Sequence, residues 1–507
     1  MHWLDLPEPR ENITLAFSDL TTARTWLAAQ PQAQPLHMLA ALRLQIEAID
    51  AAPLPPSLAL DLLGLLRTAA VPHQASIESR YTRKALPMQA EDQRSFDVAQ
   101  QLWTQLGLAY LRLAPHLPPG GKSLPLNRAA CAFRMAQFCH FQAARACPPL
   151  LDQLLLATLA QAERDDLMRL PLSDPDFPHL GEANIAGHLA WAFLLRLIDP
   201  YHLTATQLAV ANRALSRWRE LASFHVAADE DPKAQAIDLA PLFRDPLPDG
   251  IPRWLSVRSV TRKMRHRIEA LEAGESPESL KLGRELSGSA CIRLLKYLAS
   301  ALQCVPQGKS TEIGEIEISF GSEHAYAVLK GEFLNPVGTL DARAASLAHQ
   351  RMALFGFDRV SQMPTAVKKL TVPSEKWTLV DGRAIRPADQ QGDRRLTPCL
   401  IASNRQGRNC LGVMRGLQST ADGALTAQLR WFSEQIEAVG LQEVADKPRV
   451  PAFLLQRDTS CSLILPASMP VRLEETLKME GLTTHLLVPT EVLDRGVDFV
   501  RYACRAA

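Results

Sequence analysis

The stretch EIGEIEISFGSEHAYAVLKGEF, residues 312–333, marks a change in the periodicity of the sequence. Ile316, Ile318 and Phe320 alternate with the polar residues between them, so the two sets are expected to point to opposite faces of a strand. This alternation is typical of a half-buried β-strand, whereas the residues before it have the spacing of helices. The change divides the chain into a helical part and a β-rich part.

The sequence over 17–305 predicts successive amphipathic helices. Apolar residues recur at steps of three and four, and prolines such as Pro31 and Pro53 end the helical patterns. Thr204 or Thr206 is a favourable N-cap for the helix that follows it. The repeat length is irregular and lacks tetratricopeptide spacing. We therefore predict helical hairpins that form an irregular α-solenoid or a bundle.

Short strand-like runs separated by glycines and polar turns fill most of the second part, and one helix is expected at 342–356. Many short strands at this spacing predict a small barrel or sandwich. The predicted strands lie at 376–382, 398–403, 410–417, 425–432, 436–441, 451–458, 462–466, 484–489 and 497–504. The fold class is α+β and multidomain, with an α-helical, solenoid-like scaffold over 1–305 and a β-rich domain over 306–507.

The composition excludes several classes of protein. Lys and Arg number 55 and Asp and Glu 54, so the net charge is +1 and nucleic acid is not an expected partner. The first residues lack the basic and apolar regions of a signal peptide, and no apolar stretch is long enough for a membrane span. The nine cysteines contain no CxxC pair, which indicates reduced thiols in a cytoplasm. Cys131, Cys139 and Cys147 are predicted core residues rather than metal ligands.

Gly-Lys-Ser occurs twice, at 121–123 within PPGGKS and at 308–310 within PQGKST. A phosphate-binding loop needs another glycine five residues earlier, between a strand and a helix. His116 and Gln303 occupy those positions, and each tripeptide follows a helical pattern. Both are therefore interpreted as turns.

No catalytic or metal-binding constellation is found. The sequence contains no H-E-x-x-H, G-x-S-x-G or G-x-G-x-x-G pattern, and its histidines are scattered. His188 is predicted to be a hydrogen-bonded, half-buried side chain on a helix. We therefore predict that the protein is not an enzyme and has no cofactor.

Several segments over roughly 180–445 resemble large proteobacterial proteins with a helical front and a PilZ-like C-terminal region. HLAWAFLLRLIDPYHLTATQ (188–207) resembles their leucine-rich helix and the break after it, and AIDLAPLFRDPLPDG (236–250) the extended segment that follows. CLGVMRGL (410–417) and IEAVGLQEV (436–444) resemble two barrel strands. Proteins of this kind are often labelled PilZ-domain proteins or chaperones. The resemblance implies a PilZ-like barrel in the second part of the chain.

PilZ domains bind cyclic di-GMP through an R-x-x-x-R loop before the first barrel strand and a [DN]-x-S-x-x-G element on the barrel. The two guanidinium groups hold phosphates and guanine edges. At the loop position this chain has CVPQGKSTE (304–312), with Lys309 and no arginine. The nearest second element, DTSCSL (458–463), has Leu463 in place of the glycine. The ligand motif is therefore degenerate.

Clustered arginines remain as candidate ligand-binding residues. They lie in glycine-containing turns of the β-rich part, where one rim would receive a phosphate or an acidic partner, or where they are exposed loop charges. The candidates are Arg383, Arg386, Arg394, Arg395, Arg405 and Arg408, with Lys309. The helix at 258–271 carries Arg258, Arg262 and Arg265 on one face, which is either a basic docking surface or a solvated face.

The sequence thus predicts a cytoplasmic, non-enzymatic regulatory or adaptor protein. In the main interpretation the PilZ-like domain has lost its ligand and binds another protein, whose identity the sequence does not indicate. In the alternative it is an effector that binds cyclic di-GMP and transmits the ligand state to a partner.

Overall fold

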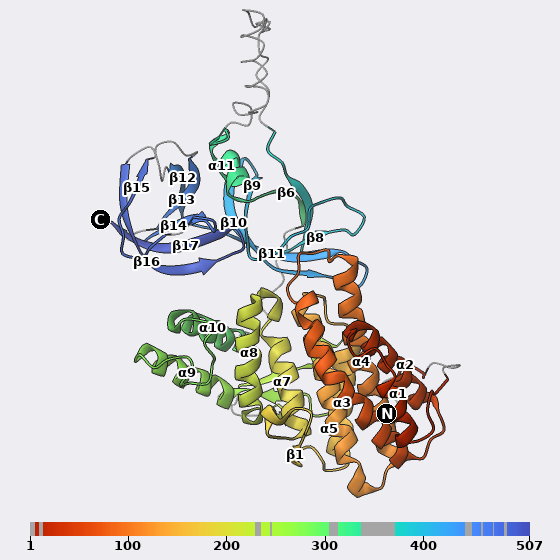
Figure 1. Cartoon of the computed structure of the whole chain (residues 1–507). Coiled ribbons are helices and arrows are strands. Elements are labelled where there is room, and N and C mark those ends of the chain that lie inside the picture. Colours follow the sequence, from red (N-terminus) through yellow and green to blue (C-terminus); the bar gives the residue numbers. More distant parts are fainter. Residues whose placement is uncertain are drawn as a thin grey trace, which may run out of the picture. The chain divides into compact units, whose positions relative to one another are not determined.

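A computed structural model describes residues 6–9, 14–228, 235–243, 246–303, 313–335, 371–441, 449–457, 460–469, 471–480 and 484–506. The chain forms two compact units (Figure 1). The first comprises residues 1–308 and 418–423, and the second residues 309–417 and 424–507. The predicted boundary at 305/306 and the predicted helix at 342–356 lie outside the described residues.

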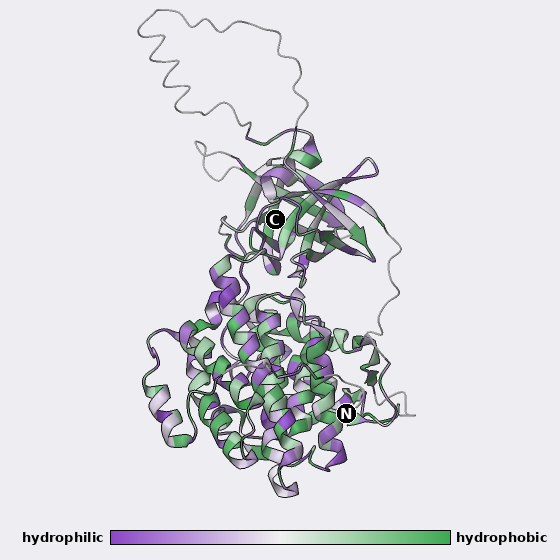
Figure 2. Ribbon diagram, turned by 90° about the vertical axis from the view of Figure 1, so that its right-hand side faces the viewer, coloured by the Kyte–Doolittle hydropathy of each residue, from purple (hydrophilic) through white to green (hydrophobic). Residues whose placement is uncertain are grey.

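The first unit is helical, as predicted. Its α-helices are α1 (Leu20–Ala28), α2 (Pro35–Ala51), α3 (Pro56–Tyr81), α4 (Ala90–Leu113), α5 (Ser123–Gln142), α6 (Pro149–Arg164), α7 (Ile185–Leu197), α8 (Ala205–Trp218), α9 (Arg258–Glu272) and α10 (Gly288–Ala301). Short 3₁₀ helices are η1 (Ala114–His116), η2 (Pro119–Gly121), η3 (Pro178–Leu180), η4 (Pro200–His202), η5 (Arg219–Leu221) and η7 (Ala240–Leu242). The helices carry both apolar and polar residues, and their apolar faces form one core (Figure 2).

Helix α5 is buried along most of its length, and it packs against α4, α6 and α7. Cys131, Cys139 and Cys147 lie in this core, as predicted. The expected N-cap of α8 is Thr204, whose hydroxyl accepts the N–H of Gln207. None of the helices in the described ranges combines the length and apolar character of a membrane span.

Two small sheets interrupt the helices, and the sequence analysis did not predict them. One pairs β1 (Leu172–Ser173) with β2 (Glu182–Ala183), and the other has the strand order β3-β5-β4. These three strands are β3 (Ser223–His225), β4 (Ala236–Asp238) and β5 (Trp254–Ser256). Strands of two or three residues are too short to produce a recognisable alternation.

The second unit contains two closed six-stranded barrels rather than the single barrel or sandwich expected. The first barrel has the order β10-β11-β8-β7-β6-β9, and its members are β6 (Gly314–Phe320), β7 (Glu375–Val380), β8 (Arg383–Arg386), β9 (Cys399–Arg405), β10 (Arg408–Ser419) and β11 (Leu425–Trp431). Helix α11 (Ser322–Lys330) follows β6 and packs against β6 and β9. The second barrel has the order β12-β13-β14-β17-β16-β15, with β12 (Gln435–Leu441), β13 (Val450–Arg457), β14 (Ser460–Pro466), β15 (Leu477–Glu480), β16 (Thr484–Arg495) and β17 (Phe499–Ala506).

All nine strand-like runs of the sequence correspond to strands, whereas β8 and β15 were missed. The alternation in β6 is also confirmed for Ile316, Ile318 and Phe320, which are buried. Ser319 differs from the expectation because it is buried too. It lies where β6 begins to pair with β9.

The two barrels share a hydrophobic cluster, in which Leu400 and Leu411 of the first barrel lie with Phe453 and Phe499 of the second. Asp498 belongs to the same junction. Its carboxylate accepts the backbone N–H of Leu400 at 3.0 Å. Burial raises the pKa of Asp498 to about 6, against the opposing effects of that hydrogen bond and of the Arg395 charge.

The raised pKa of Asp498 predicts a pH-dependent stability. The folded protein binds the proton more tightly than the unfolded chain, so the stability is expected to fall as the pH rises from about 4 to about 7. A shift of two units corresponds to about 3 kcal/mol. Asp498→Asn should raise the free energy of unfolding at pH 7 by up to that amount and change it little at pH 4, measured by urea unfolding. The exposed Asp389→Asn is the control, and equal effects of both variants would contradict the assignment.

Candidate ligand-binding site in the first barrel

In the first barrel, β6 and β9 pair along only a small part of their length. β6 pairs with β7 from Gly314 to Ile318, but it pairs with β9 only through Ser319 and Phe320. Continuing the antiparallel register would place the end of β9 opposite the first half of β6. Among these described residues no such pairs form, although the other edge of β9 is paired with β10 along its whole length. The two edges therefore separate and leave an opening in the barrel wall.

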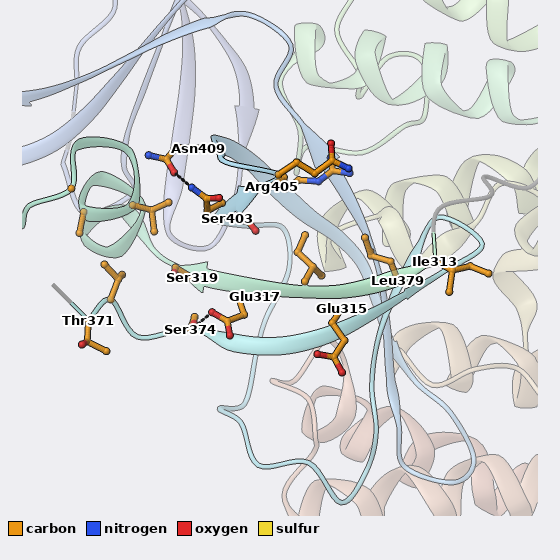
Figure 3. A pocket seen from close by; sticks show the side chains of 18 residues that line it. Ile313, Glu315, Glu317, Ser319, Thr371, Ser374, Leu379, Ser403, Arg405 and Asn409 are labelled. Atoms are coloured by element: carbon orange, nitrogen blue, oxygen red, sulfur yellow. Dashed lines mark hydrogen bonds between the residues drawn. The ribbon is translucent and has the colours of Figure 1, made fainter. Parts of the chain in front are cut away.

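This opening is a pocket of about 1290 Å³, which we call the seam pocket. It is lined by Ile313, Gly314, Glu315, Ile316, Glu317, Ser319, Ala327, Val328, Gly331, Thr371, Val372, Ser374, Leu379, Ser403, Asn404, Arg405, Gln406 and Asn409. Figure 3 shows Ser403, Arg405 and Asn409 on one side of β6, and Glu315 and Ser374 on the other. One wall thus carries a guanidinium and amides, and the other carries carboxylates.

Ser403 supplies a buried polar atom to the seam pocket. Only 2% of this residue is exposed, and its Oγ has no hydrogen-bond partner among the described residues. An unsatisfied buried hydroxyl costs about 1–3 kcal/mol, because it has lost water without gaining another partner. This hydroxyl is therefore available to a ligand that enters the pocket.

The β9–β10 hairpin holds the polar wall in place. Its two-residue turn has positive φ at Gln406 (49°) and Gly407 (79°), which is the conformation that matches the twist of a hairpin. The N–H of Gly407 donates to Asn404 Oδ1 at 3.1 Å, and Asn404 Nδ2 donates to Asn409 Oδ1 at 2.7 Å. These bonds fix both amide side chains at the rim.

Arg405 is the guanidinium of the pocket wall. Its Cζ lies 5.4 Å from the centre of the Trp431 ring, within the range of a cation–π contact. Arg408 lies directly opposite Arg405 in the hairpin register and is exposed. The predicted pair Arg405 and Arg408 is therefore brought together, with one member lining the pocket.

Arg386 and Arg395 are also brought together, but by a carboxylate. Arg386 is buried, and it donates to Glu375 at 2.9 Å. Arg395 donates to the other oxygen of Glu375 at 2.5 Å and lies over the Phe320 ring. Both guanidinium groups thus have an ion-pair partner within the barrel wall.

The remaining candidates lie elsewhere. Arg383 is exposed on β8, opposite Gln428 of β11, and Arg394 is exposed in the segment between β8 and β9. Lys309 lies outside the described residues, four positions before Ile313 in the pocket wall. The predicted second motif element falls in the other barrel, where Leu463 is part of the core.

Sequence reasoning missed Ser403, Glu315 and Glu317 as pocket residues. The residues around Ser403 do not match [DN]-x-S-x-x-G, because Ile401 and Gln406 occupy the positions of the acidic or amide residue and the glycine. The one sequence signal for this site was the short turn NRQGRN at residues 404–409. The separation of β6 from β9 has no counterpart in the local sequence.

The chain's other motifs are structural. Lys122 of the first Gly-Lys-Ser forms an ion pair with Asp165 at 3.3 Å, and the tripeptide joins α4 to α5. His188 is fully buried rather than half-buried, and neither ring nitrogen has a partner among the described residues. Burial, with the charges of Arg134 and Arg219, lowers the pKa of His188 to about 3. Its imidazole is therefore neutral.

Comparison with known proteins gives a match in the helical unit. Residues 21–230 match the model of a family described as the cyclic-di-GMP receptor FimW, N-terminal domain. This range covers less than half of the chain and overlaps the predicted resemblance over 180–230. No curated protein and no solved structure matches the chain. Over residues 21–230, the helical unit is thus similar to the N-terminal domain of a cyclic di-GMP receptor.

Proposed function

We propose that the protein is a non-enzymatic receptor for cyclic di-GMP and that it binds this ligand in the seam pocket. The match of residues 21–230 to the N-terminal domain of a cyclic-di-GMP receptor carries the proposal. It favours the effector interpretation over that of a ligand-free adaptor. Because cyclic di-GMP is an intracellular messenger, the receptor acts in the cytoplasm.

The polar wall of the seam pocket suits the sugar-phosphate ring of the ligand. Cyclic di-GMP carries two negatively charged phosphodiester groups, and a guanidinium binds a phosphate by charge-assisted hydrogen bonds. Arg405 supplies that group, and the neighbouring Trp431 ring limits its orientation. The hydroxyl of Ser403 donates to a second acceptor on the ligand and thereby gains a hydrogen-bond partner.

The carboxylates of the opposite wall suit the bases. The Watson–Crick edge of guanine presents two adjacent N–H donor groups, and an ionised carboxylate accepts both. Glu315 and Glu317 are exposed on that wall, and Ser374 donates to Glu317 at 3.4 Å. An acidic wall therefore distinguishes guanine from adenine, which lacks this pair of donors. A volume of about 1290 Å³ is large enough to admit a dinucleotide.

Replacing Arg405 with alanine is expected to weaken cyclic di-GMP binding by the full-length protein about tenfold or more. A charge-assisted hydrogen bond contributes roughly 1.5–3 kcal/mol, and the substitution removes it. Isothermal titration calorimetry gives the dissociation constants. Arg383→Ala, an exposed arginine of the same barrel outside the pocket, is the matched control and should leave binding unchanged. Cyclic di-AMP, titrated into the wild type, should bind more weakly than cyclic di-GMP.

Two results separate the parts of this proposal. No binding by the wild type at millimolar cyclic di-GMP would reject the receptor function and favour the adaptor interpretation. Binding that Arg405→Ala leaves unchanged would reject the seam pocket while retaining the receptor. In that case the double variant Arg394→Ala/Arg395→Ala tests the remaining arginine cluster.

A further inference from the structure

Two cysteines of the second barrel lie directly opposite each other. Cys461 on β14 pairs with Cys504 on β17 in the antiparallel register of these neighbouring strands (Figure 1). Direct antiparallel pairs have Cα atoms about 4.5 or 5.5 Å apart, depending on the hydrogen-bond pattern. Both separations lie within the range of about 4.4–6.8 Å that a disulfide bond requires. The backbone of the two strands is therefore already placed for a bond between these residues.

The side chains of this pair lie on the same face of the sheet. Residues two apart on a strand point to one face, so Cys461 lies beside Leu463, and Cys504 lies beside Tyr502. Leu463 and Tyr502 belong to one hydrophobic cluster of the second barrel, and both cysteines pack against that cluster. Rotation about the Cα–Cβ bonds then brings the two sulfur atoms together.

The surroundings of the pair suit a disulfide better than two thiolates. Both residues are present as thiols, and both are half-buried, so a small oxidant can reach them. Burial raises the pKa of the Cys461 thiol. Burial and then the charge of Cys461 raise the pKa of Cys504 to about 12. A disulfide carries no charge, so the apolar surroundings that disfavour a thiolate accept it.

We propose that Cys461 and Cys504 are a site of reversible oxidation, at which a small disulfide such as oxidised glutathione produces a cross-strand disulfide bond. One protein thiolate attacks a sulfur of the small disulfide, whose S–S bond breaks and releases one small thiolate. The second protein thiolate attacks the resulting mixed disulfide and releases the other small thiolate. The two cysteines lose two electrons to the small disulfide, and their two protons pass to the released thiolates.

The bond links two strands that are distant in the chain. In a reducing cytoplasm the pair stays as thiols, and an oxidant converts it. Because β15 and β16 lie between β14 and β17 in the sequence, the bond restricts the unfolded chain and stabilises the second barrel. The site is independent of the cyclic di-GMP proposal, because neither cysteine lines the seam pocket.

Peptide mapping of the oxidised full-length protein tests the site. The folded protein is incubated with oxidised glutathione, the remaining thiols are alkylated, and the chain is digested with trypsin. Cleavage after arginine releases residues 458–472, with Cys461, and residues 502–505, with Cys504. Mass spectrometry should find these two fragments joined, with two hydrogens fewer than their sum, and dithiothreitol should separate them. Oxidation should also raise the unfolding temperature of the second barrel by about 5 °C or more.

Cys504→Ser should lose the joined fragments and the rise in unfolding temperature. Cys410→Ser is the matched control and should behave as the wild type, because Cys410 is a half-buried cysteine on β10 with Ser403 opposite it. Circular dichroism checks that both variants are folded. Wild-type protein in which both cysteines are still alkylated after the oxidant, or carry glutathione without a link between them, would overturn the proposal. Joined fragments without a rise in unfolding temperature would overturn the stabilising role.

Discussion

Replacing Arg67 with leucine is expected to destabilise the helical unit by about 3–5 kcal/mol, because it leaves buried carboxylates without their partner. The Arg67 side chain on α3 is completely buried, and its guanidinium forms ion pairs with Asp174 and Asp176. It also lies 5.1 Å from the centre of the Phe177 ring. These contacts hold the segment between α6 and α7 against α3, which lies about a hundred residues earlier in the chain.

The loss of stability caused by Arg67→Leu is expected to depend on pH. Burial raises the pKa of Asp174, but the hydrogen bond and charge of Arg67, together with the backbone N–H of Asp176 and the charge of Arg128, outweigh it, so the pKa lies below its usual value. The ion pair therefore stabilises the protein above the pKa of the unfolded chain, and this contribution is lost as the pH falls. The difference between wild type and variant should shrink toward acidic pH.

Urea unfolding followed by circular dichroism measures the Arg67 effect. Arg284→Leu is the control, because Arg284 pairs with Glu278 at the surface, where an ion pair contributes less than about 1 kcal/mol. Adding Asp174→Asn and Asp176→Asn to the Arg67→Leu variant should recover part of the stability. A loss no larger than that of the control would show that the buried pairs do not hold this segment.

Replacing Glu375 with alanine is expected to destabilise the first barrel by a similar amount, about 3–5 kcal/mol. Glu375 on β7 accepts hydrogen bonds from Arg386 and Arg395 and from the backbone N–H of Asp393 at 3.0 Å. Burial raises its pKa, but these hydrogen bonds and charges outweigh the effect and leave the pKa lowered. Its stabilisation is therefore also lost as the pH falls below the pKa of the unfolded chain.

The Glu375→Ala variant leaves the buried Arg386 guanidinium without its carboxylate. The paired variant Glu375→Met/Arg386→Met removes both charges, so it should be less destabilised than the single substitution. Thermal unfolding followed by circular dichroism compares them, with Glu437→Ala on β12 as a half-buried carboxylate control. A single variant as stable as the wild type would contradict a structural role for this cluster and return Arg386 and Arg395 to the list of ligand candidates.

The arginine candidates show how far residue type alone can locate a site. Arg386 and Arg395 have the same glycine-rich surroundings in the sequence as Arg405, and a basic cluster was predicted for all of them. The structure distinguishes Arg386 and Arg395, because Glu375, which lies before them in the chain, forms ion pairs with both. Sequence distance does not reveal such a pairing, since it depends on how β7 and β8 are placed side by side.

The helical first part, the change to strands near residue 314 and most strand positions were predictable from the sequence, because these follow from local periodicity. The closure of the strands into two barrels, the separation of β6 from β9, and the burial of Ser403 without a partner among the described residues depend on long-range contacts and were visible only in the folded structure. Strand pairing joins residues that are more than eighty positions apart, as Ser319 and Ala402 are. The burial of a polar atom likewise depends on neighbours that the fold brings together. The local sequence pattern does not encode these neighbours.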